Sequence, residues 1–151
     1  MKALDYPAKH NLNAAAGWLD LGNPEEAKAE VDRIPLSKRF HPDVFVMRWR
    51  IYARAEDWAA AHKLARIFAK RWPDRPAGWL CHAYSLHKMN RTLEAFMCLL
   101  PQARVFPTVS AIPFLLACFC RQMGNTKEAD LWLGRSAELG EIGRASCRER
   151  V

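Results

Sequence analysis

Apolar residues recur every three or four positions along most of the chain, which is the spacing of one face of an α-helix. The first such stretch covers residues 12–21 and ends at Gly22, a residue type that commonly follows the last turn of a helix. A helix start follows at once, because Asn23 can cap free backbone N–H groups and Pro24 suits the first helical turn. The pattern therefore predicts two helices separated by a tight turn at Gly22.

The same two-helix pattern returns three more times. The apolar positions of the first helices are Phe45, Trp49 and Tyr52, then Trp79, Ala83 and Leu86, then Leu116, Ala117 and Cys120. Those of the second helices are Trp58, Ala61, Leu64, Ala65 and Phe68, then Ala95 and Leu99, then Ala129, Leu131, Trp132 and Leu133. Pro73 and Pro107 are expected to stop the second helices that precede them, because proline lacks a backbone N–H. We expect most of the six tryptophans to belong to the core.

A sequence repeat underlies this pattern. The segment 22–27 returns as 124–129, three repeat lengths later. One column of the repeat holds the same small residue in every unit: Ala27, Ala61, Ala95 and Ala129. A methyl side chain lets two helices cross closely, so the column predicts where the helices of each unit meet.

These columns resemble the tetratricopeptide repeat (TPR), whose pattern places Trp, Leu-Gly, Tyr, Ala, Phe and Pro at fixed offsets over a unit of about 34 residues. The third unit matches best, through Trp79, Ala83, Leu86, Ala95, Leu99 and Pro107. The chain departs from the pattern at Arg48 and His82, where Leu is usual, and at Trp49, where a small residue is usual.

The resemblance implies an all-α, right-handed superhelical solenoid of about four helix-turn-helix repeats. We expect an N-terminal segment at residues 1–8 and a repeat domain at 9–140, with units of approximately 8–41, 42–75, 76–109 and 110–140. Residues 141–151 resemble the translation of a sequencing adapter, and we expect them to be a non-native tail.

Composition fits a folded helical domain, with 50% hydrophobic and 26% charged residues and a net charge of +7. The longest uncharged apolar stretch, 109–120, is shorter than the roughly 20 residues of a membrane-spanning helix. No secretory signal precedes it, so we expect a cytoplasmic, bacterial protein whose cysteines are reduced thiols.

No catalytic or metal-binding motif is visible. Cys81, Cys98, His82 and His87 lack zinc-ligand spacing, and there is no glycine-rich phosphate loop or nucleophile motif. His82, in a packing column, is expected to be a partly buried core histidine. We therefore expect a protein that is not an enzyme and needs no cofactor or metal.

The resemblance also implies a binding surface, since the first helix of each TPR unit lines the concave face of the solenoid. Carried over unit by unit, the candidate groove residues are Val46, Arg50, Arg54, Leu80, Tyr84, His87, Lys88, Phe114, Arg121 and Gln122. Leu12 and Ala16 replace the Lys and Asn that clamp chaperone tails in the family, so no such clamp is expected.

The expected function is that of a scaffold that binds a peptide or protein partner, and the basic groove favours an acidic or C-terminally carboxylated segment. The alternative is a nucleic-acid-binding solenoid, suggested by the net positive charge and the aromatic residues. Acidic residues such as Asp20 and Asp43 interrupt a continuous basic stripe and count against it. Self-association through an uncapped C-terminal end is a further expectation. No membrane contact is expected.

Overall fold

The computed structural model describes the backbone of residues 3–149 and the side chains of residues 3–140. These residues form helices joined by short loops, without any strand in the described part of the chain. The helices are α1 (Tyr6–Asp20), α2 (Pro24–Asp32), a 3-10 turn (Leu36–Lys38), α3 (Pro42–Arg54), α4 (Trp58–Arg71), α5 (Pro76–Lys88), α6 (Thr92–Leu99), α7 (Gln102–Val105), α8 (Ala111–Gln122) and α9 (Thr126–Glu149).

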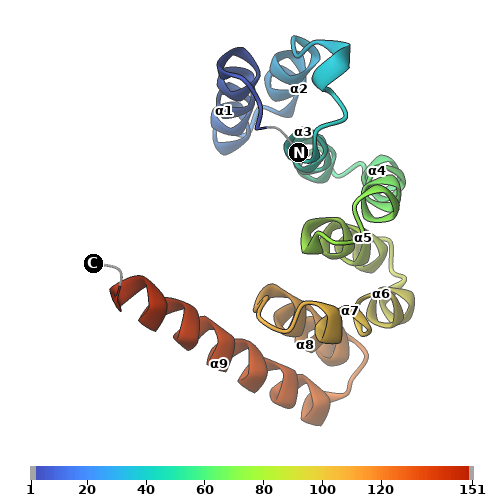
Figure 1. The fold of residues 1–151 in the computed structure, drawn as a ribbon. Helices are drawn as coiled ribbons and strands as arrows, with labels where there is room; N and C mark the ends of the chain where they lie inside the picture. The colour runs from blue at the N-terminus through green and yellow to red at the C-terminus, as the bar shows by residue number, and fades with distance from the viewer. Residues whose placement is uncertain (1–2, 150–151) are drawn as a thin grey trace.

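Successive helices pack as antiparallel pairs, α1 with α2, α3 with α4, α5 with α6, and α8 with α9. The pairs stack into an arc in which α2, α4 and α6 lie on the outer side and α3, α5 and α8 on the inner side (Figure 1). Neighbouring pairs contact each other mainly through α2 with α3, α4 with α5, and α6 with α8. The apolar core is therefore continuous along the arc, as in a repeat solenoid.

The turn inside each helix pair has one backbone geometry, which recurs once in every repeat unit. One residue of each turn has a backbone in the left-handed region. These residues are, in order along the chain, Gly22 (φ +78°), Glu56 (φ +58°), Asn90 (φ +62°) and Gly124 (φ +83°). In the first pair the N–H of Gly22 donates to the carbonyl of Leu19, and the N–H of Asn23 donates to that of Trp18. The other three turns repeat both bonds, which is the Schellman arrangement that satisfies the last carbonyls of a helix.

The next residue caps the second helix of the pair. The side-chain oxygens of Asn23, Asp57 and Asn125 each accept a hydrogen bond from the backbone N–H three residues later, at 3.2–3.3 Å. The third pair differs, because Arg91 occupies this position and makes no side-chain cap. The predicted helix start at Asn23 and Pro24 is confirmed.

The alanine column lies where the two helices of each pair meet. Ala27, Ala61, Ala95 and Ala129 are each 0% exposed, as the repeat predicted. The contact between the second and third units is closer still, at Gly78 in α5. A Cβ atom on Gly78 would lie 2.8 Å from the backbone N and Cα atoms of Ala69 in α4, so glycine is required there for steric reasons.

The second helix of the third unit is interrupted, contrary to the uniform pattern. Helix α6 ends at Leu99, and the short α7 follows Pro101 before the expected stop at Pro107. Pro101 has no N–H to donate and its ring crowds the preceding turn, so the helix cannot continue through it.

The tryptophans are less buried than the sequence predicted. Trp72, which belonged to none of the predicted columns, is 8% exposed and packs between Phe45 and Phe68. The other five are partly exposed. Trp79 packs one side against the core of the third and fourth units, and its indole N–H donates to the Pro73 carbonyl at 3.0 Å. Their columns are correct, but most tryptophan rings lie at the rim of the core.

The last helix, α9, continues through residues 141–149, whose side chains lie outside the described part of the structure. The predicted non-native tail at residues 141–151 falls on this segment and is not tested. On the described part of α9, Leu131 is 71% exposed. Self-association through this end stays a prediction. None of the described helices is long and apolar enough to cross a membrane.

Candidate functional site

A cavity of about 440 Å³, open to solvent, lies where the last turns of α1, α3 and α5 come together. It is lined by Leu19, Asp20, Trp49, Arg50, Ala53, Arg54, Trp58, Tyr84 and Lys88. Three successive units contribute to it through their first helices, and α4 adds only its first residue, Trp58. Its size is in the range of small-ligand sites, about 300–1,000 Å³.

Three aromatic rings form one wall of the cavity. The ring centroids are 6.5 Å apart for Trp49 and Trp58, 5.9 Å for Trp49 and Tyr84, and 5.7 Å for Trp58 and Tyr84. Both tryptophans pack against Tyr84 edge to face, the arrangement that ring quadrupoles favour. Because each ring contacts the other two, the wall is ordered before any ligand arrives.

Hydrogen bonds hold Trp49 in place. Its indole N–H donates to the hydroxyl oxygen of Ser85 at 2.8 Å. Ser85 is fully buried, and its own hydroxyl donates to the Cys81 carbonyl one turn earlier at 2.7 Å. A buried hydroxyl needs such partners, so this chain fixes the Trp49 ring between α3 and α5.

Three cations face the same cavity. The Lys88 ammonium lies 5.9 Å from the centroid of the Trp58 ring and 5.6 Å from that of Tyr84, a cation–π geometry. Arg50 and Arg54 are one helical turn apart on α3 and are exposed. Among the described side chains, none of these three cations makes an ion pair with a carboxylate. Arg54 and Lys88 lie in the last turns of their helices, where the helix dipole favours positive charge.

The structure brings together Arg50, Arg54, Tyr84 and Lys88 from the expected groove. Trp49 and Trp58 complete the wall, although their repeat columns predicted core positions. The position of Trp58 as the first residue of a second helix, directly after the turn, is the sequence signal that could have placed it near the groove.

The other expected groove residues lie outside this cavity. Val46 lines a separate pocket of about 310 Å³ with Leu12 and Asp43. His87 does not line the cavity: its Nδ1 is 3.1 Å from the Thr92 hydroxyl, and its ring packs against Phe119 and contacts Tyr84. Leu80 packs against the core of the third unit, whereas Phe114, Arg121 and Gln122 are exposed on α8.

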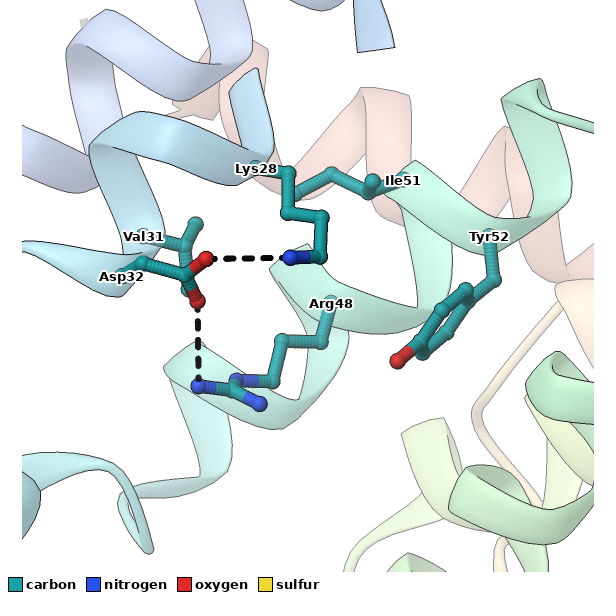
Figure 2. Close-up of a pocket in the computed structure, with 6 residues that line it drawn as sticks. All are labelled: Lys28, Val31, Asp32, Arg48, Ile51 and Tyr52. Atoms are coloured by element: carbon teal, nitrogen blue, oxygen red, sulfur yellow. Dashed lines mark hydrogen bonds and ion pairs between the residues drawn. The ribbon is translucent and has the colours of Figure 1, made fainter. Parts of the chain in front are cut away.

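A much smaller pocket lies between α2 and α3, with a volume of about 20 Å³ (Figure 2). The Lys28 ammonium forms an ion pair with Asp32 Oδ2 at 3.1 Å, and the Arg48 guanidinium lies 3.9 Å from Asp32 Oδ1, so both cations point toward one carboxylate. The space suffices for about one water molecule. Arg48, where the family has Leu, thus packs its stem between the helices and directs its charge to Asp32.

Two histidines and a cysteine meet where α4, α5 and α6 come together. The Nε2 atoms of His62 and His82 are 3.2 Å apart, and the Nδ1 of His82 is 3.4 Å from the Cys98 sulfur. Burial lowers the pKa of His82 to about 4, with further contributions from His62, Arg66 and Arg91. His82 uses its two ring nitrogens on different neighbours, and no group of described side chains is arranged to hold a metal ion. His82 is the partly buried core histidine that its repeat column predicted.

No family model matches the chain, and no curated protein matches its sequence. Solved structures of MamA match its fold. The structure described as MamA MSR-1 C2 superposes on this chain with a TM-score of 0.67 and 17% sequence identity, and the match covers 95% of this chain and 82% of that one. The structure described as MamA AMB-1 P212121 superposes with a TM-score of 0.68 and 17% sequence identity, and the match covers 93% of this chain and 83% of that one.

The chain has a TPR-like fold. MamA is itself a TPR-like helical repeat protein, and the similarity extends over nearly the whole chain. The expected all-α solenoid of about four TPR-like repeats is therefore confirmed. Sequence identity of 17% supports the fold alone, and the ligand has to be inferred from the cavity between α1, α3 and α5.

Proposed function

We propose that this protein is a non-enzymatic interaction module that binds an acidic peptide segment of a partner protein in the cavity between α1, α3 and α5. The observation that carries the proposal is the set of three cations, Arg50, Arg54 and Lys88, that line the cavity without a carboxylate partner among the described side chains. A TPR-like fold, which commonly presents such a face to a partner, supports the same conclusion.

The chemistry of the cations suits carboxylates. The guanidinium groups of Arg50 and Arg54 can each form two parallel hydrogen bonds to a carboxylate, which gives orientation as well as affinity. Asp20, on the α1 side of the cavity, repels a second negative charge at that edge. An extended acidic segment is therefore expected to lie along α3 and α5, with its acidic side chains toward Arg50, Arg54 and Lys88.

A fluorescence-anisotropy titration with a labelled peptide rich in Asp and Glu tests this proposal. Replacing both Arg50 and Arg54 by Glu should weaken binding by at least about a hundredfold, because two attractive contacts become repulsive. Arg121→Glu is the matched control, since Arg121 is an exposed first-helix arginine outside the cavity. Equal affinity for the double variant and the wild type, with unchanged circular dichroism, would refute the proposal.

A nucleic-acid ligand is the alternative that the same cations could serve. Binding to nucleic acid weakens steeply with salt, since it releases counterions from the phosphate backbone. The assay is repeated with a labelled polyuridine probe at about 50 and about 200 mM salt, an interval over which phosphate contacts lose most of their affinity. Tight polyuridine binding that the Arg50 and Arg54 substitutions abolish, together with no peptide binding, would favour the alternative.

A further inference from the structure

We propose that the groove selects peptides in which an aromatic or large aliphatic side chain is flanked by acidic residues, and that Trp58 and Tyr84 form the subsite for that side chain. This inference rests on the proposed function and specifies its ligand. Its basis is the placement of one cation, Lys88, directly over the two rings.

Lys88 places one positive charge of the groove next to its aromatic wall. Its ammonium lies 5.9 Å from the centroid of Trp58 and 5.6 Å from that of Tyr84, so a ligand carboxylate that pairs with Lys88 lies at the edge of the aromatic wall. The residue next to that carboxylate in the peptide then comes within side-chain reach of both rings. A hydrophobic side chain at this position is removed from water, whereas a small or polar one gains little.

The aromatic wall is also suited to selection because it is rigid. The Trp49 indole is fixed by its 2.8 Å hydrogen bond to buried Ser85, and Trp49 supports the other two rings. A ligand ring that packs edge to face on an ordered wall loses only its own freedom. The cavity of about 440 Å³ has room for such a side chain beside a paired carboxylate.

The three cations favour acidic over basic or neutral peptides that carry an aromatic side chain. An aromatic side chain in a basic or neutral peptide would leave Arg50, Arg54 and Lys88 facing no negative charge, and a cationic peptide would be repelled. The groove should therefore bind a segment that combines both features most tightly. An acidic peptide without a large apolar side chain should bind more weakly, and a basic aromatic peptide most weakly.

Three peptides with an N-terminal fluorescein and a C-terminal amide test the inference by fluorescence anisotropy: Asp-Glu-Phe-Asp-Glu, the same peptide with Ala in place of Phe, and Lys-Lys-Phe-Lys-Lys. The wild-type protein should bind the acidic Phe peptide about tenfold more tightly than the acidic Ala peptide, and the basic peptide least. Trp58→Leu should lower the affinity for the Phe peptide to that for the Ala peptide. Trp132→Leu, outside the cavity, should keep the tenfold preference.

The outcomes separate this inference from the proposed function. Equal affinity for the acidic Phe and Ala peptides would overturn the aromatic subsite and leave the acidic-peptide groove standing. Binding of neither acidic peptide by the folded wild-type protein would overturn both. Tyr84→Leu provides the second test if Trp58→Leu does not fold, and retention of the preference in that variant would also overturn the subsite.

Discussion

The indole N–H of Trp49 donates a 2.8 Å hydrogen bond to the hydroxyl of Ser85, which links the first helices of the second and third units. The family pattern has a small residue at the position of Trp49, where a large ring projects toward the next unit. Ser85 lies directly beneath it and is fully buried. The pair therefore accommodates a bulky departure from the repeat pattern and sets the position of one wall of the cavity.

Breaking this bond should lower stability by about 1 kcal/mol, the usual net value of a protein hydrogen bond. Trp49→Phe removes the donor and keeps a smaller aromatic ring, and Ser85→Ala removes the acceptor. Chemical denaturation of both single variants and the double variant gives the coupling energy, expected at about 0.5–1.5 kcal/mol. Strictly additive losses would show that the two side chains do not act together.

Gly78→Ala should destabilise the protein by about 1–3 kcal/mol, because the new methyl group meets the Ala69 backbone at 2.8 Å and forces α4 and α5 apart. Gly17→Ala is the matched control, since nothing lies within 4 Å of its added Cβ atom. That substitution should stabilise α1 by about 0.5–1 kcal/mol. A thermal melt of Gly78→Ala at or above the wild-type midpoint contradicts the close helix approach.

Glu56→Gly should raise stability by about 1 kcal/mol, because Glu56 holds the left-handed conformation that glycine adopts in the first and fourth turns. Ala55→Gly is the control next to it. Ala55 has ordinary right-handed geometry, so glycine there only adds freedom to the unfolded chain and should destabilise. If both glycine variants lose stability, the turn at Glu56 does not have the repeated geometry.

Stability should fall as the pH decreases from about 7 toward 4. The pKa of His82 is about 4 in the folded protein and 6.5 when unperturbed, so between these values the unfolded chain binds more protons. A proton on His82 would place a positive charge in a partly buried site, beside His62 and near Arg66 and Arg91. Water reaches part of the ring and screens this cost, so we expect a loss of about 1–2 kcal/mol.

The measurement is the free energy of unfolding at pH 7 and pH 5 for the wild type and for His82→Gln. The variant should lose less stability than the wild type over this interval, because it lacks the titrating ring. The pKa values of His62 and His87 are lowered too, so the comparison with the variant isolates His82. The same pH dependence in both proteins would show that His82 does not cause it.

Local signals made the helices and turns predictable from the sequence. Gly22 and Asn23 determine their turn through short-range backbone bonds, and the alanine column follows from a period that a single sequence displays. The left-handed conformation of Glu56 was not predictable from its residue type, whereas Asn90 is a type that commonly adopts it at the end of a helix. Pro101 was an available signal for the break after α6.

The candidate site was harder to predict, because its shape depends on how one unit sits on the next. The register placed Arg50, Arg54, Tyr84 and Lys88 on one face, and the structure brings these four side chains to one cavity. The position of Trp58 directly after the turn was the sequence signal that could have placed it beside them, although its repeat column predicted a core position. The sequence could not show that His87 would turn toward Phe119, since both orientations fit the same helical spacing.

The most direct test of the groove is a nuclear magnetic resonance titration that follows the tryptophan indole N–H signals while an acidic peptide is added. The signals of Trp49 and Trp58, which line the cavity, should shift in proportion to peptide binding. Those of Trp79 and Trp132, which pack against the core outside it, should remain in place. Peptide binding that shifts Trp79 or Trp132 and leaves Trp49 and Trp58 unchanged would contradict the account.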